Sequence, residues 1–381
     1  MIIKIKSNNV VTPYGITSDN IYLKDSKILA IGGPDLPYDM ELNAENDYVL
    51  PGLIDIHTHG AAGHDYSNSA PEDIINAVRY SVIHGATSIL PTITSSSYEK
   101  TYSALLNIER AMSHPTFGSR ILGAHLEGPY FSEKQSGAQD KAFITDPKKE
   151  DYERLLARFG HIIKRWDYAP ERDKSGTFCA YLTAHGVLPS AGHTDAKYDD
   201  MLIAKENGCH LITHLYSCTS TITREKGYRK LGVIECAYLW DDVFVEIIAD
   251  GSHLPIELLQ LIFKLKPVER IILITDSMSV TGTQAKTGTL SNVEYLIEDG
   301  VCKLLDRSAF AGSIATAEKL LQVCYSAGKG ICDIVKMGSE NPAALFCLNK
   351  GRIQQGFDAD IIITNKDFNL KTVIAGGEII K

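Results

Sequence analysis

The stretch Ile54-Asp-Ile-His-Thr-His-Gly60 ends a mostly apolar run with two histidines that are separated by one residue. Successive side chains of a β-strand point to opposite faces, so residues i and i+2 share a face. If the stretch is a strand, the imidazoles of His57 and His59 lie side by side at its carboxyl end. The stretch therefore predicts a buried strand with a pair of nitrogen ligands at its tip.

Seven similar runs follow along the chain, and amphipathic segments separate them. We expect the eight strands at Leu53–His57, Ala86–Pro91, Ile121–Glu127, Lys164–Tyr168, Val187–His193, His210–His214, Phe244–Asp250 and Ile271–Asp276. Among the helices that we expect between them are Pro71–His84, Tyr98–Met112, Ala196–Asn207 and Pro255–Leu265. Eight such units in about 300 residues are typical of a (β/α)8 TIM-type barrel. The alternative, an open doubly wound sheet, needs a glycine-rich phosphate turn after an early strand, and the sequence has none there.

The two ends of the chain have a different pattern, with short strands separated by turn-forming residues. These strands are expected at Ile2–Ile5, Ile21–Leu23, Ile28–Ile31, Asp360–Thr364 and Thr372–Ala375. We expect residues 1–50 and 349–381 to form one small β-sandwich domain, and residues 51–348 to form the barrel. After the eighth barrel strand, a hairpin around Asp299-Gly300 is predicted, with strands Val293–Ile297 and Val301–Leu305, and it is a candidate lid.

The composition limits the class of protein. The 381 residues are 44% hydrophobic and 22% charged, which is ordinary for a globular chain. A net charge of −9 disfavours nucleic acid as a partner, because phosphate binding needs a positive surface. No apolar run approaches the roughly 18 residues of a membrane span, and the eight cysteines lack CxxC spacing. We expect a cytoplasmic protein that binds neither nucleic acid nor a membrane.

Metal-competent side chains also end other predicted strands. Glu127 ends the third strand and His193 the fifth; His214 ends the sixth and Asp276 the eighth. Barrel active sites lie where the carboxyl ends of the strands converge. A lone histidine at a strand end is usually structural, but six such side chains at five tips predict one metal centre. Its expected ligands are His57, His59, Glu127, His193, His214 and Asp276.

The ligand types limit the metal and suggest its chemistry. Imidazole and carboxylate suit Zn²⁺ first, and Fe²⁺, Co²⁺ or Mn²⁺ are compatible. A bound ion lowers the pKa of water from 15.7 towards about 7, which gives a nucleophile at neutral pH. One or two ions are possible, and a carboxylate such as Glu127 can bridge two of them. Asp276 can then carry a proton from the water to the leaving group.

These motifs resemble the amidohydrolase superfamily and, within it, the N-acetylglucosamine-6-phosphate deacetylases. The resemblance is carried by Pro51-Gly-Leu-Ile-Asp-Ile-His-Thr-His-Gly60, His125-Leu-Glu-Gly-Pro129, Ser190-Ala-Gly-His-Thr194, Thr213-His-Leu215, Ala249-Asp-Gly-Ser-His253, Ile274-Thr-Asp-Ser277, Ala311-Gly-Ser313 and Asn341-Pro-Ala343. It implies hydrolysis of the N-acetyl amide of an amino sugar 6-phosphate, glucosamine or an epimer, with release of acetate and the amine.

The resemblance also implies roles for single residues. Glu127, His193 and His214 correspond to the principal metal site, and His57 with His59 corresponds to a second one. Asp276 corresponds to the catalytic acid and base, and His253 to a catalytic histidine that contacts the substrate and polarises its carbonyl. The resemblance implies a homodimer in which Arg224 binds phosphate, often across the interface. The implied substrate-binding residues are Ala138, Gln139, Ser217, Cys218, Arg224, His253, Ala311 and Gly312.

Departures from the family pattern occur around the expected substrate pocket. Ser136-Gly-Ala-Gln139 stands where the family usually has Lys-Gly-Ala-His, and Ser217-Cys-Thr219 where it has Asn-Ala-Met. An amidohydrolase for another N-acyl substrate, such as an unphosphorylated amino sugar or an N-acyl amino acid, is therefore the alternative. A cyclic-amide hydrolase would need a lysine at the tip of strand four, and Lys164 lies at its start. A catalytically silent sugar-binding relative is expected to have lost Asp276 or a ligand, and none is missing.

Overall fold

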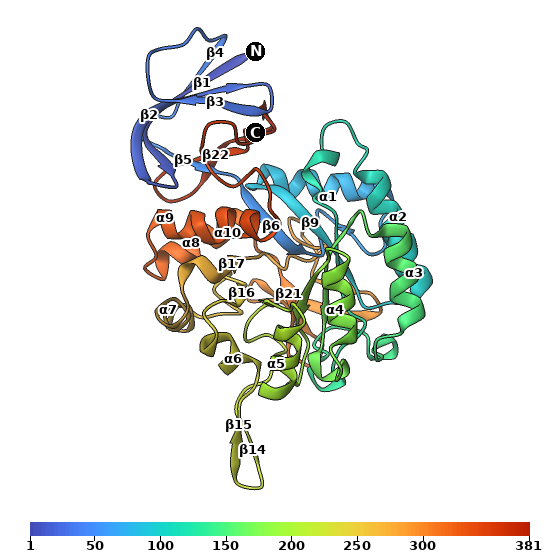
Figure 1. Cartoon of the computed structure of the whole chain (residues 1–381). Coiled ribbons are helices and arrows are strands. Elements are labelled where there is room, and N and C mark those ends of the chain that lie inside the picture. The colour runs from blue at the N-terminus through green and yellow to red at the C-terminus, as the bar shows by residue number, and fades with distance from the viewer.

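The computed structural model describes all 381 residues and contains the predicted barrel. Eight strands pair side by side, all parallel, in the order of the chain (Figure 1). They are β6 (Leu53–Thr58), β9 (Ala86–Thr94), β10 (Ala124–Glu127), β11 (Ile163–Tyr168), β12 (Leu188–Ala191), β13 (Leu211–Ile212), β16 (Phe244–Ile247) and β17 (Ile271–Leu273). The outermost two, β6 and β17, are joined at the mouth by a hydrogen bond from Asp276 N to His57 O of 2.9 Å. All eight predicted strands are confirmed, and the last four in chain order, β12, β13, β16 and β17, end two or three residues earlier than expected.

Helices surround the strands and bury their apolar faces. They are α1 (Pro71–Ile83), α2 (Tyr98–Ala111), α3 (Lys149–Phe159), α4 (Thr177–Ala184), α5 (Tyr198–Glu206), α6 (Val233–Leu239), α7 (Ile256–Leu265) and α8 (Ala317–Ser326). In α2, Ser97 caps the first turn and Leu105 and Ile108 face the core, as the 3.6-residue spacing predicts. The four predicted helices are confirmed within two residues at each end. None of the helices combines the length and apolar character that crossing a bilayer requires.

Short elements complete the barrel domain. Below β6 and β17 lie α9 (Ile331–Val335), the π-helix Lys336–Glu340 and α10 (Asn341–Leu345). Single-turn helices occur at Gly118–Arg120, Glu133–Gln135, Lys141–Phe143, Pro170–Arg172 and Val268–Arg270, and β7 (Gly60–Ala61) pairs with β8 (His64–Asp65). A core cluster of eight buried residues, including Ile54, Leu211 and Ile272, comes mainly from the barrel strands. A separate cluster of 68 buried residues takes in helices and strands together.

The two chain ends pair in one sheet, as predicted. Its strands are β1 (Ile2–Thr12), β2 (Gly15–Lys24), β3 (Lys27–Ile31), β4 (Met40–Asn43), β5 (Tyr48–Pro51), β22 (Ile361–Thr364), β23 (Leu370–Ala375) and β24 (Glu378–Ile379). The pairing order is β24-β23-β22-β5-β1-β2-β3, with β4 on β1. β5 and β22 join the two ends in antiparallel register, so the N-terminal and C-terminal segments build one structure.

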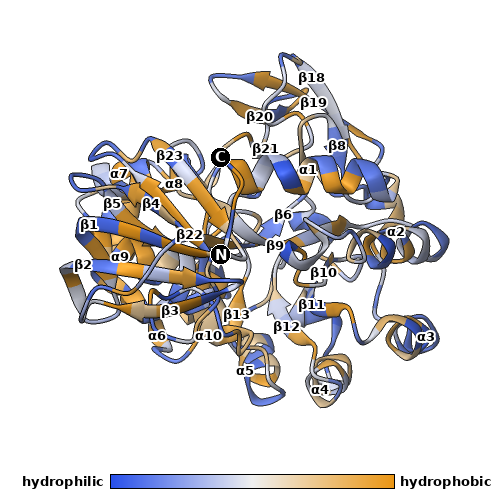
Figure 2. Cartoon of the chain, turned by 90° about the horizontal axis from the view of Figure 1, so that it is seen from above, coloured by the Kyte–Doolittle hydropathy of each residue, from blue (hydrophilic) through white to orange (hydrophobic).

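This terminal sheet uses its two faces differently. Ile361 and Ile363 belong to the sheet's own core of 13 buried residues, whereas Ile362 between them packs with the barrel core. Figure 2 shows the apolar residues along these strands in orange. The buried ion pair between Arg120 Nη1 and Asp360 Oδ1, 2.8 Å apart, adds a polar contact to the same junction. The division at residues 50 and 349 stays a prediction.

Two further antiparallel elements lie outside the barrel strands and the terminal sheet. The predicted hairpin after the eighth strand is confirmed and extended to four antiparallel strands, here called the lid sheet: β18 (Thr287–Leu290), β19 (Val293–Glu298), β20 (Val301–Leu304) and β21 (Phe310–Ser313). Its core residues Leu290, Tyr295 and Cys302 pack with Ala138 and Met278 of the barrel domain. The second hairpin, β14 (Thr223–Glu225) and β15 (Tyr228–Lys230), projects from the barrel like an arm (Figure 1). We call residues 223–230 the basic arm.

Candidate metal centre and active site

The predicted ligands converge at the mouth of the barrel by two local devices. His57, His59 and Glu127 lie in or just beyond β6 and β10, where strand alternation aims them. His193, His214 and Asp276 come just after strands and have positive φ angles of 45°, 28° and 49°. Such backbone conformations cost on the order of 1–3 kcal/mol for non-glycine residues and persist where the surroundings enforce them. The predicted strands therefore end early because their last residues turn towards the mouth.

Glu127, His193 and His214 form a triangle of the right size for one ion. Glu127 Oε1 is 3.0 Å from His193 Nε2 and 3.3 Å from His214 Nε2, and the two Nε2 atoms are 3.2 Å apart. Ligands bound at roughly 2.0–2.1 Å in tetrahedral geometry lie about 3.3 Å from one another. The other ring nitrogens contact backbone oxygens, His193 Nδ1 that of Gln135 at 2.9 Å and His214 Nδ1 that of Ser217 at 3.0 Å. These contacts turn both Nε2 atoms towards Glu127.

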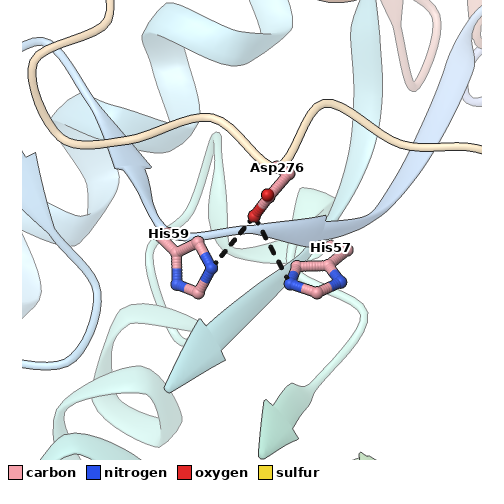
Figure 3. A group of neighbouring side chains, drawn as sticks. All are labelled: His57, His59 and Asp276. Carbon is pink, nitrogen blue, oxygen red and sulfur yellow. Dashed lines mark ion pairs between the residues drawn. The ribbon is translucent and has the colours of Figure 1, made fainter. Parts of the chain in front are cut away.

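A second group joins the first through Glu127. Figure 3 shows Asp276 facing His57 of β6 and His59 just beyond it, with Asp276 Oδ1 3.1 Å from His59 Nε2 and 3.5 Å from His57 Nε2. Glu127 Oε2 lies 3.5 Å from His59 Nε2. The Nε2 atom of His57 is fully buried and has no hydrogen-bond partner, although carboxylate oxygens surround it. A divalent cation would satisfy this nitrogen, so the donor set fits a metal.

The electrostatics of the site also favour a cation. Burial acts to lower the pKa of His57, but the carboxylates of Glu127, Glu246 and Asp276 outweigh it and raise the pKa well above its ordinary value. Burial likewise acts to raise the pKa of Glu127, yet the surrounding histidines lower it well below the ordinary range. Both shifts have the same cause: several carboxylates share one buried site and stabilise positive charge there, whether it is carried by a proton on His57 or by a bound cation.

A buried ionic network lies beneath the ligands, and sequence reasoning missed it. Arg165 pairs with Asp167 at 2.8 Å and with both oxygens of Glu246. Glu246 Oε2 also lies 3.4 Å from His57 Nδ1 and accepts a hydrogen bond of 3.3 Å from His214 N. Glu246 is the one charged residue in the strand Phe244–Ile247, and this isolated charge was the available signal. Partners of this kind orient the metal ligands of enzymes.

A cavity of about 240 Å³ opens above the ligands. Every predicted substrate-binding residue except Arg224 lines it, as do His59, Glu127, His193, His214 and Asp276. The sequence analysis missed four lining residues, of which Leu290, Ala309 and Phe310 come from the lid sheet and its turns and Tyr216 follows His214. No lysine or arginine lines the cavity.

His253 is held in one orientation by Asp250, which sequence reasoning also missed. His253 Nδ1 lies 2.7 Å from Asp250 Oδ2, and Asp250 Oδ1 accepts hydrogen bonds of 2.8 Å from Ser252 N and His253 N. Burial acts to raise the pKa of Asp250, but these contacts lower it below its ordinary value. The ring of Phe310 packs edge-on against His253 with centroids 4.8 Å apart. Nε2 is therefore the free ring nitrogen of a fixed imidazole at the cavity.

Arg224 lies elsewhere. It belongs to β14 of the basic arm, where its neighbours Thr223 and Glu225 are also exposed. Neither it nor Arg229, its cross-strand partner, forms an ion pair within the chain. Lys197, at the start of α5, pairs with Glu225 of the arm. Within one chain, the predicted phosphate ligand and the predicted reaction centre are thus in different places.

Comparison with known proteins agrees with this site. The sequence model of the amidohydrolase family matches residues 48–380. The chain belongs to the amidohydrolase family. As an amidohydrolase it is a hydrolytic enzyme, and the metal-competent groups described above are in keeping with a family that is typically metal-dependent.

Three relatives show how far this amidohydrolase is similar to known deacetylases. It is 31% identical to the N-acetylglucosamine-6-phosphate deacetylase of Bacillus subtilis, over 98% of this chain and 96% of that protein. It is 30% identical to the enzyme of the same name from Lysinibacillus sphaericus, over 94% and 92%. The solved structure of a mutant N-acetyl-D-glucosamine-6-phosphate deacetylase from Mycobacterium smegmatis, in complex with N-acetyl-D-glucosamine-6-phosphate, superposes with a TM-score of 0.92 at 26% identity and covers 100% of this chain and 99% of that one. The predicted resemblance and fold class are confirmed.

Proposed function

We propose that this amidohydrolase removes the acetyl group of N-acetylglucosamine-6-phosphate or an epimer, releasing acetate and the amino sugar phosphate. One observation carries the proposal: the ligand triangle, the Asp276 carboxylate and His253 line the same cavity. An amide hydrolase needs these three parts within reach of a single carbonyl group. The names of the relatives supply the substrate class.

The proposed cofactor is a divalent cation, with zinc first and iron, cobalt or manganese compatible with the same donors. Glu127, His193 and His214 would hold the principal ion, and His57, His59 and Asp276 would complete a second site. When bound, the ion supplies Lewis acidity, which polarises a carbonyl and lowers the pKa of water.

The remaining chemistry falls to side chains of this chain. Asp276 Oδ1 faces the centre of the site, where it can accept the proton of the attacking water. The same carboxylic acid then delivers that proton to the amine nitrogen as the C–N bond breaks, so Asp276 ends unprotonated. His253, fixed by Asp250, contacts the substrate carbonyl and orients it. Catalysis by positioned proton transfer contributes typically about 10²–10⁴-fold.

We also propose a homodimer in which Arg224 of one copy binds the phosphate held in the cavity of the other. Two observations support it: the cavity has no basic lining residue, and the basic arm carries Arg224, Lys226, Arg229 and Lys230 on an exposed hairpin. A phosphate carries up to two negative charges, and the arginine fork matches its oxygens.

Complementation between two impaired chains, assayed at a substrate concentration well below KM, tests this dimer. Arg224→Ala chains and Asp276→Asn chains are mixed, unfolded and refolded together. If Arg224 acts across the interface, one site of each mixed dimer has both residues, and about a quarter of the wild-type activity returns. Activity no higher than that of the separate variants would show that Arg224 acts within its own chain or not at all.

The alternative is an unphosphorylated N-acyl substrate, and the absence of lysine and arginine from the cavity lining favours it. One assay separates the two. The purified protein, with its metal content measured, is given N-acetylglucosamine-6-phosphate, N-acetylgalactosamine-6-phosphate and both unphosphorylated sugars, and released amine is counted. We expect turnover of a phosphorylated sugar at least about 100-fold above its unphosphorylated form, the scale of two charge-assisted hydrogen bonds. Turnover of unphosphorylated sugars alone would contradict the proposal.

A cytoplasmic location stays a prediction, which the eight free cysteines favour.

A further inference from the structure

Gln139 connects a strand end to the metal centre. Its side chain, in a residue that is only 5% exposed, accepts a hydrogen bond of 2.9 Å from Ser95 N at Oε1. Its Nε2 donates a hydrogen bond of 2.6 Å to Glu127 Oε2. A backbone N–H can only donate, so Ser95 determines which end of the Gln139 amide is oxygen. The donor end of the amide must therefore face the Glu127 carboxylate.

The two oxygens of Glu127 consequently have different surroundings. Oε1 faces His193 Nε2 and His214 Nε2 at 3.0 and 3.3 Å. Oε2 receives the amide hydrogen of Gln139 and lies 3.5 Å from His59 Nε2. A bridge between two ions uses one carboxylate oxygen for each ion. An amide N–H pointing at Oε2 engages the oxygen that the second ion would need.

We propose that Gln139 is a positioning residue that reserves Glu127 Oε1 for the ion at His193 and His214 and weakens binding of a second ion beside His57, His59 and Asp276. The inference rests on the proposed metal centre and is independent of the substrate. In this role Gln139 influences how many metal ions the site binds. The second N–H of its amide stays available for the substrate contact that the sequence predicts.

Metal titration of the stripped protein tests this role. The wild type and Gln139→Leu, which is of similar size but lacks the carbonyl oxygen and the NH2 of the amide, are dialysed against a series of free Zn²⁺ concentrations. Bound zinc per chain is then counted. We expect one tight ion in both proteins, and a second ion that binds at least about 10-fold more tightly in the variant, the scale of outer contacts of metal ligands. The same titration with Co²⁺, followed by its visible absorption, reports the ligands of each ion separately.

Controls separate this role from general damage. Gln322→Leu, in α8 and far from the centre, makes the same chemical change and should leave both affinities unaltered. Should Gln139→Leu fail to fold, Gln139→Met carries the same test. Equal affinity for the second ion in wild type and variant, or a wild type that binds two ions equally tightly, would overturn the inference. Zinc binding by neither protein would instead overturn the proposed metal centre. Absence of deacetylation with the expected zinc binding would contradict the proposed function and would leave the role of Gln139 in metal binding intact.

Discussion

The mouth of the barrel and the basic arm carry the two halves of the proposed reaction, and they are built in opposite ways. At the mouth, Glu127, His57 and Asp276 are buried and each contacts other members of the site. In the arm, residues from Thr223 to Arg229 are exposed, and its arginines contact no carboxylate of this chain. The barrel fixes the chemistry within one chain, whereas the arginines of the arm have no carboxylate partner there.

The comparison shows which region of the molecule needs a precise side-chain geometry. Metal ligands and proton carriers must hold their geometry to a few tenths of an ångström, so they are over-determined by buried contacts. A phosphate anchor works through charge and can be carried on a flexible, exposed element that docks onto another copy. Changes at the mouth should therefore affect stability or turnover, while changes in the arm should affect only binding and association.

The largest expected effect is that of Glu246→Gln on stability. The substitution removes one of the two carboxylates that neutralise Arg165, which is fully buried. We expect the free energy of unfolding to fall by about 3 kcal/mol, the scale for breaking a buried ion pair. Urea unfolding monitored by circular dichroism measures it. The matched change in the arm, Glu225→Gln, should stay within about 0.5 kcal/mol. Equal losses of unfolding free energy in the two variants would contradict the proposed difference between the mouth and the arm.

Asp276→Asn comes next and separates catalysis from folding. Asparagine keeps the shape of the side chain but cannot accept and return a proton. We expect kcat to fall at least about 100-fold, or about 2.7 kcal/mol, with the unfolding transition little changed. Steady-state amine release measures kcat. Asp306→Asn, in the exposed turn between β20 and β21, is the control and should keep full activity. Full activity of Asp276→Asn would remove Asp276 from the proton path.

Arg224→Ala should affect substrate binding without affecting the chemical step. We expect KM for the phosphorylated sugar to rise about 10-fold, at the low end for a hydrogen bond to a charged group, with kcat within about twofold. KM for an unphosphorylated sugar should not change. Arg229→Ala makes the same charge change at the cross-strand position. An equal rise of KM in Arg229→Ala would mean that the arm acts as a diffuse positive charge and not through Arg224.

Phe310→Leu is expected to have the smallest effect, because Phe310 is partly exposed like the arm but packs on His253 of the mouth. Loss of the edge-on contact removes about 0.5–1.5 kcal/mol of interaction. We expect KM to rise about threefold with kcat nearly unchanged, as measured by the same amine assay. Tyr325→Leu, on the exposed side of α8, is the control. A fall of kcat by more than about 10-fold would place Phe310 in the chemical step.

Much of the barrel and the ligand set follows from local sequence. Apolar runs of strand length and helices with 3.6-residue spacing place all eight strands, because these signals depend on neighbouring residues only. Ligands at strand tips are predictable for the same reason, since parallel strands bring their carboxyl ends together. The clearest example is the pair His57 and His59, which are separated by one residue.

Other parts of the site escaped prediction because they depend on residues far apart in the chain. Glu246 meets Arg165 across 81 positions, and Gln139 meets Ser95 across 44. No local pattern indicates which buried charges will be partners. Phe310 and Leu290 enter the cavity only because the lid sheet folds over the mouth.

By itself, the sequence determined the barrel, the terminal sheet, and the residue types that could hold a metal and move a proton, because periodicity and strand polarity act over short distances. Only the tertiary structure decided the spacing of the ligand triangle, the tie from Gln139 to Glu127, and the separation of Arg224 from the cavity. These depend on side-chain distances between distant segments, which only packing of the whole chain sets.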